Sequence, residues 1–122
     1  MNLHLQGAYG QVSAILQSPR EAEYEVIARV TRELSRAKAL RQNLPRKMLE
    51  ALYLNDRLWS ALVSDVVLEA NGLPPSLKAK LIYLYRFSLH QSALIREGRG
   101  EVDVLIEINQ AVMRGLRGEG GR

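Results

Sequence analysis

The sequence predicts an all-α protein that folds as a compact bundle of about five helices. Apolar residues recur at spacings of three and four along most of the chain, and no segment shows the apolar–polar alternation of a half-exposed strand. The chain has 122 residues, which fits one domain with one modest hydrophobic core. We expect a single helical domain over residues 1–117 and a disordered tail over residues 118–122, which lack apolar side chains.

The first two helices differ in how clearly the sequence marks them. A weak helix is expected over about residues 5–17, because Gly7 and Gly10 each cost roughly 1 kcal/mol relative to alanine. The second helix begins at Ser18-Pro19-Arg20-Glu21, a capping box with proline at the first helical position. Its apolar stripe extends the helix to about residue 42 and consists of Val26, Ile27, Val30, Leu34, Ala37 and Leu40.

Two long helices are expected in the middle of the chain. The third begins at Pro45 and continues to the stop signal Asn71-Gly72, and a bend near Asn55 is an alternative that would divide it. The fourth opens at Leu73-Pro74-Pro75-Ser76 and ends at Gly98. Both are apolar over more than one narrow face. Either both are central in the bundle, or part of their surface forms a groove for an amphipathic partner helix.

A fifth helix is expected from about Glu101 to residue 117. Acidic Glu101 and Asp103 lie in its first turn and basic Arg114 and Arg117 at its end, an arrangement that complements the helix dipole. The sequence therefore ends in a well-marked amphipathic helix followed by the short tail.

Residue types and motifs argue against catalysis. The chain contains no cysteine, which excludes disulfides, thiolate metal sites and cysteine nucleophiles. The two histidines, His4 and His90, lie far apart, and His90 has no acidic residue three or four positions away. No glycine-rich phosphate loop follows a strand. We therefore expect no enzymatic activity, no metal, no cofactor and no small-molecule substrate.

The apolar runs are too short to span a membrane, and the first residues lack the pattern of a signal peptide. We expect a cytoplasmic protein that does not insert into membranes, and the lack of cysteine suits that reducing compartment.

The formal net charge is +4, and the basic residues are unevenly distributed. Residues 29–47 contain seven basic side chains and one acidic side chain, Glu33. Arg29, Arg32 and Arg36 follow spacings of three and four, so they line one strip of the second helix. This strip is either a solvated outer face or a surface for RNA phosphates or an acidic partner. Because no aromatic residues are interleaved with it, RNA binding is the less favoured interpretation.

Several segments, in order and at characteristic spacing, carry a family resemblance: Ala8-Tyr9, 18–24, 30–34, the Asn-x-x-Leu-Trp segment within 54–62, Leu73-Pro74 and 105–116. They resemble the FlaF family of flagellar biosynthesis regulators. The similarity runs from about Ala8 to Leu116, and implies a bacterial cytoplasmic protein needed for making and exporting flagellin. Members of this family are thought to bind flagellin as export chaperones and to act with FlbT, a regulator of flagellin translation.

The matching positions supply candidates for partner contact. Trp59 is either a core anchor or an interface residue, since large aromatic side chains dominate both. Asn55 and Asn109 interrupt apolar stripes, so each either satisfies a buried polar group or hydrogen-bonds a partner. The candidates are Tyr9, Arg20, Tyr24, Asn55, Trp59 and Asn109.

Two functions other than flagellin binding remain open from the sequence. One is an RNA-binding regulator that acts on flagellin mRNA through the strip of Arg29, Arg32 and Arg36. The other is an adaptor that binds FlbT only.

Overall fold

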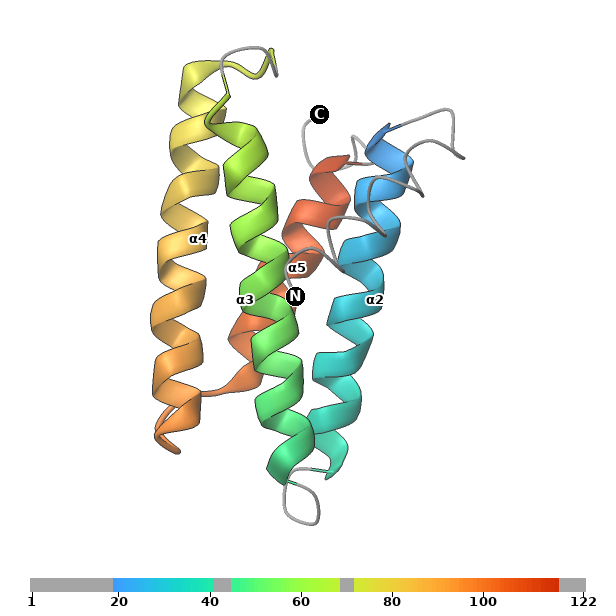
Figure 1. Cartoon of the computed structure of the whole chain (residues 1–122), viewed down its shortest axis with the longest axis vertical. Coiled ribbons are helices and arrows are strands. Elements are labelled where there is room, and N and C mark those ends of the chain that lie inside the picture. Colours follow the sequence, from blue (N-terminus) through green and yellow to red (C-terminus); the bar gives the residue numbers. More distant parts are fainter. Residues whose placement is uncertain (1–18, 41–44, 69–71, 117–122) are drawn as a thin grey trace.

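The computed structural model describes residues 19–40, 45–68 and 72–116, which form four α-helices and, within these ranges, no strand (Figure 1). The predicted all-α class is confirmed. The weak helix expected over residues 5–17 and the tail expected over residues 118–122 lie outside the described residues. The helices are α2 (Pro19–Leu40), α3 (Pro45–Val66), α4 (Pro75–Arg96) and α5 (Val102–Leu116).

The four helices form a bundle in which successive helices run in opposite directions (Figure 1). α2 packs against α3 and α5, and α4 packs against the same two helices. α2 and α4 therefore lie at opposite corners of the bundle, and among the described helices α4 packs only on α3 and α5.

Helix boundaries follow proline and glycine signals with one exception. α2, α3 and α4 begin at Pro19, Pro45 and Pro75, where the missing N–H of proline costs no helical hydrogen bond. α4 ends at Arg96, two residues before the predicted stop at Gly98, whose φ of 78° lets the chain turn back and whose N–H donates to the Ile95 carbonyl at 2.9 Å.

The exception is the end of α3. The helix is continuous through Asn55, so the alternative of a bend at that residue is not observed. Its predicted extension to Asn71-Gly72 is wrong, because α3 ends at Val66. Val67 and Leu68 continue the apolar pattern of the sequence but are 55% and 56% exposed, so they gain little from a longer helix.

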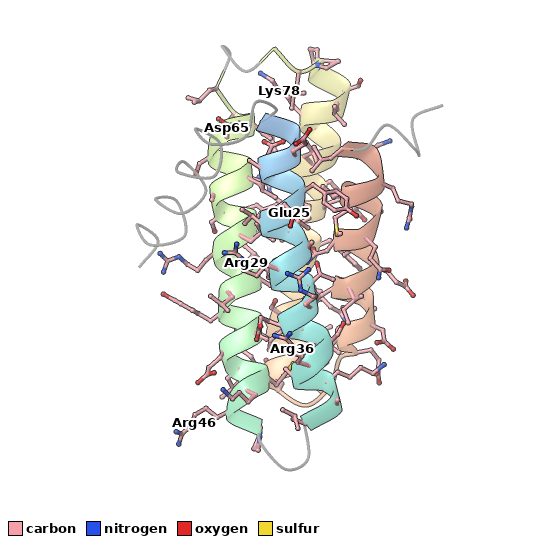
Figure 2. All side chains as sticks on the ribbon, turned by 90° about the vertical axis from the view of Figure 1, so that its right-hand side faces the viewer. Glu25, Arg29, Arg36, Arg46, Asp65 and Lys78 are labelled. Carbon is pink, nitrogen blue, oxygen red and sulfur yellow. The ribbon has the colours of Figure 1, made fainter. Side chains whose placement is uncertain are left out.

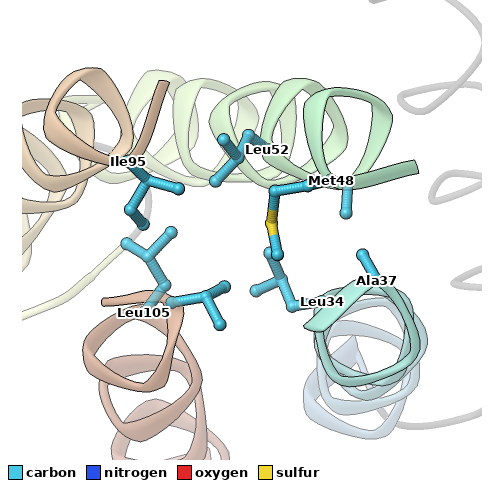
Figure 3. Close-up of a cluster of buried hydrophobic side chains, with 8 residues drawn as sticks. Leu34, Ala37, Met48, Leu52, Ile95 and Leu105 are labelled. Atoms are coloured by element: carbon cyan, nitrogen blue, oxygen red, sulfur yellow. The ribbon is translucent and has the colours of Figure 1, made fainter. Parts of the chain in front are cut away.

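The hydrophobic core consists of two clusters stacked along the bundle. One cluster draws side chains from all four helices (Figure 3): Leu34, Ala37, Met48, Ala51, Leu52, Ile95, Val102 and Leu105. The other joins α2 to α3 through Val26, Ile27, Val30, Leu58 and Trp59. These residues match the apolar stripes of the sequence, so burial of those stripes accounts for the packing.

α4 contributes least to this core. Its buried residues are Ser88, Gln91, Ser92 and Ile95, of which only Ile95 is apolar. The other inward residues of α4, among them Leu81, Leu84 and Tyr85, are only partly buried against the second cluster. Most of the apolar side chains of α4 are therefore not fully buried in the core.

Candidate partner-binding surface

Three of the predicted contact residues form a polar network inside the bundle. The indole Nε1 of Trp59 donates to Asn109 Oδ1 at 3.0 Å. Asn109 Nδ2 in turn donates to Asn55 Oδ1 at 2.8 Å and to Thr31 Oγ1 at 3.1 Å. The Thr31 hydroxyl donates to the Ile27 carbonyl at 2.7 Å. These bonds join α2, α3 and α5 across the core.

Burial decides between the two roles left open for these residues. Asn55 and Asn109 are 0% exposed, and Trp59 is 1% exposed. None of the three presents a surface to a partner in the closed bundle. They pair most of one another's polar groups, which would otherwise be costly to bury, and Asn55 Nδ2 is the one side-chain polar atom of the three without a hydrogen-bond partner within the described residues.

The remaining candidates lie near the start of the chain. Tyr9 and the side chain of Arg20 lie outside the described residues. Tyr24 is half-buried in the first part of α2. The structure therefore does not bring the six candidates together into one surface.

The basic strip of α2 does lie on the outside of the bundle. Arg29, Arg32 and Arg36 are all exposed. Arg36 forms an ion pair with Glu33 at 2.8 Å on the same helix. Figure 2 shows Arg29 and Arg36 on the outer side of α2, with Arg46 near the start of α3. The strip is a solvated cationic surface that an acidic partner can reach.

A second surface is apolar, and the sequence indicated its helices but not its residues. Among the described residues, the large hydrophobic side chains left exposed lie almost entirely on α3, on α4 and between them. This distribution agrees with the prediction that both helices are apolar over more than one face. The exposed side chains are Leu40, Leu49, Tyr53, Leu54, Val67, Leu68, Leu77, Tyr83 and Phe87.

Two of these side chains form an ordered pair on the outer side of α4. Tyr83 is 65% exposed and Phe87 is 38% exposed. Their rings stack with centroids 6.3 Å apart and planes inclined by 11°. A spacing of four residues places both on one side of the helix. This spacing is visible in the sequence, but other apolar pairs on α4 share it, so it does not single out Tyr83 and Phe87.

Polar contacts made by the other sides of α4 fix this orientation. Asp56 of α3 accepts hydrogen bonds from Ser92 Oγ and from Arg96 Nη2, both at 2.8 Å. Gln91 Nε2 donates to the carbonyl of Glu101 at 3.1 Å, which ties α4 to the start of α5. Because these side chains face the bundle, the aromatic pair is held toward solvent.

The described residues lack two further kinds of feature. They contain no group of three or more His, Cys, Asp or Glu side chains placed to hold a metal ion. None of the four described helices is long and apolar enough to cross a membrane.

Comparison with models of known protein families places the chain in one family. The family model described as flagellar protein FlaF matches residues 5–116, which is most of the chain. The chain belongs to the FlaF family. The matched region includes the four described helices of this FlaF protein, together with its buried network and the exposed aromatic pair on α4. No curated protein and no solved structure is significantly similar to it.

Proposed function

We propose that this FlaF protein binds flagellin in the cytoplasm as an export chaperone and regulates flagellin synthesis and secretion together with FlbT. Membership of a flagellar protein family supports the biological setting. The observation that best supports a binding role is the exposed stack of Tyr83 and Phe87 on α4, outside the core. Exposed apolar side chains that gather on one part of a surface are typical of protein-binding sites.

The physical basis of such a chaperone is the covering of apolar stripes. The terminal segments of flagellin carry helical apolar stripes that pair only in the filament, so the free subunit exposes them. Covering that surface is favourable by roughly 25 cal/mol per Å² before the costs of association. Ordering a partly disordered client offsets part of this gain, which keeps the complex weak enough for release during export.

The proposal is tested by mixing the purified protein with monomeric flagellin and separating the mixture by size-exclusion chromatography. We expect the two proteins to co-elute at micromolar concentrations. Separate elution at those concentrations would contradict the chaperone role. The same experiment with FlbT in place of flagellin tests the regulatory partnership, and co-elution with FlbT alone would favour the adaptor function.

A second candidate function rests on the exposed strip of Arg29, Arg32 and Arg36. Arg29 and Arg32 form no ion pair within the described part of the chain, so both are available for phosphates. A gel-shift titration of flagellin mRNA against salt tests this function. Phosphate-driven binding is tightest at low salt, so the absence of a shift there would exclude it.

A further inference from the structure

We infer that the outer face of α4 is the docking surface for the client, and that it takes an amphipathic helical segment whose apolar stripe is flanked by carboxylates. We define this outer face by Lys80, Tyr83, Arg86, Phe87 and His90, which are all exposed. The inference rests on the proposed function, because flagellin is taken as the client.

The apolar part of the outer face is an unpartnered aromatic platform. Tyr83 and Phe87 stack on each other, and Leu94, seven residues after Phe87, extends the same side of the helix with partial exposure. The stacking limits the freedom of both rings before any partner binds. A partner that covers them therefore gains apolar burial at a reduced cost in side-chain entropy.

Charge defines what kind of partner fits this platform. α4 contains no acidic residue between Pro75 and Arg96, but it carries Lys78, Lys80, Arg86 and Arg96. Lys78 donates to the Leu68 carbonyl, and Arg96 is paired with Asp56.

Lys80 and Arg86 differ from those two basic residues. Neither forms an ion pair within the residues that the structure describes. Each lies three residues from Tyr83, one before it and one after, so the platform is flanked by two available cations. A segment with Asp or Glu beside its apolar stripe complements this arrangement, and a basic segment is repelled.

Tyr53 and Leu49, two other exposed apolar side chains, are less suited to this role. Tyr53 of α3 is already covered in part by Arg57, whose guanidinium lies 5.2 Å from the ring centroid and donates to the Tyr53 hydroxyl. Leu49 lies beside the ion pair of Lys47 with Glu50. Tyr53 therefore already has a cationic neighbour, and the charges near Leu49 are already paired. On the outer face of α4, by contrast, the cations Lys80 and Arg86 form no ion pair within the described residues.

Matched variants separate the outer face of α4 from the rest of the surface. Y83S/F87S removes the aromatic platform, and L49S/Y53S removes two exposed apolar side chains from α3 as its control. K80E/R86E reverses the flanking charges. R29E/R32E is its control, because each pair lowers the net charge by four and takes the formal value of +4 to zero. Circular dichroism melting checks that each variant folds.

Binding is measured by fluorescence anisotropy with labelled monomeric flagellin at low and moderate salt. We expect Y83S/F87S and K80E/R86E each to weaken binding by about tenfold or more, and both controls to stay within about twofold of the wild-type protein. Added salt should weaken the wild-type complex more than it weakens the K80E/R86E complex, because screening acts on attraction that the variant has lost.

The outcomes are distinguishable. No binding by the wild-type protein overturns the proposed function and the docking inference together. Wild-type binding that survives in both α4 variants overturns the docking inference and leaves the proposed function intact. Phosphatidylglycerol vesicles and poly(U) RNA serve as alternative probes. If the α4 variants lose binding to either probe but keep flagellin binding, the outer face of α4 serves a different partner and the inference is wrong. K80E/R86E keeps the test decisive if Y83S/F87S does not fold.

Discussion

At the scale of single residues, Asn109 is the centre of the buried network. Its side-chain oxygen accepts from Trp59, and its nitrogen donates to Asn55 and Thr31. No other described side chain joins three helices in this way. Its role is therefore to fix the relative position of α2, α3 and α5 rather than to contact a partner.

Replacing Asn109 by alanine should lower the free energy of unfolding by roughly 2–4 kcal/mol, because the buried indole N–H of Trp59 and the side-chain oxygen Oδ1 of Asn55 both lose their hydrogen-bond partner. Urea denaturation at 25 °C measures this loss. Gln110→Ala, an exposed position on the same helix, is the control and should change the free energy of unfolding by no more than about 0.5 kcal/mol. Equal stability of the two variants would contradict a structural role for the network.

Asp56 helps to hold α4 to α3 through its hydrogen bonds to Ser92 and Arg96. Asp56→Ala should cost about 1–2 kcal/mol of unfolding free energy, because a carboxylate with 20% of its side chain exposed loses two charge-assisted hydrogen bonds. Glu50→Ala breaks an ion pair on the same helix with side chains 57% and 56% exposed, and should cost no more than about 0.5 kcal/mol. Chemical denaturation compares them, and a greater loss for Glu50→Ala would be inconsistent with this assignment.

At the scale of elements, the four helices differ in how strongly buried contacts fix them in the bundle. α2, α3 and α5 share the buried network and most of the fully buried apolar side chains, whereas α4 buries Ser88, Gln91 and Ser92 around a single buried isoleucine. Apolar burial is the main stabilising term, so an interface of small polar side chains is weaker. α4 is therefore the helix that most readily adapts to a bound partner.

Native-state hydrogen exchange tests this difference between helices. Amides in the central turns of α4 should exchange faster than those in the central turns of α2 and α3, because local opening of α4 exposes less buried apolar surface. Equal protection in all three helices would show that the bundle opens only as one unit.

Replacing either of two glycines by alanine should change the stability of the protein, but in opposite directions. Gly98→Ala should destabilise the protein by roughly 1–2 kcal/mol, because alanine is strained at a φ of 78°. Gly115→Ala should stabilise it by up to about 0.5–1 kcal/mol, because the position is helical and a Cβ there meets no atom within 4 Å. Thermal melting of both variants shows the sign, and a gain from Gly98→Ala would refute the helix-ending role.

These elements also show what the sequence could and could not predict. Helix starts at Pro19, Pro45 and Pro75 were predictable because proline acts locally. The end of α3 was not, because Val67 and Leu68 are as apolar as buried residues and only the packing leaves them exposed.

The candidate site was harder to predict than the helices. On α4, apolar side chains occur on several faces, and α3 and α5 determine which face is covered. The pattern alone therefore could not select Tyr83 and Phe87. For Asn55 and Asn109, the sequence left core and interface equally open, and only burial distinguishes them.

At the scale of the whole molecule, the two candidate surfaces belong to different corners of the bundle. The outer face of α4 is apolar with flanking cations, while the strip on α2 is cationic without aromatic side chains. Because α2 and α4 lie at opposite corners, a client on α4 leaves the α2 strip accessible. A substitution on one surface should therefore leave binding at the other unchanged.

Flagellin binding by this FlaF protein, as proposed above, can be measured as an equilibrium constant. An equilibrium titration of the full chain with monomeric flagellin, followed by isothermal calorimetry, tests it most directly. We predict saturable binding with a Kd of about 1 µM or below, equivalent to roughly −8 kcal/mol. The absence of saturable binding at concentrations about a hundred times higher, with both proteins folded, would contradict the proposed binding.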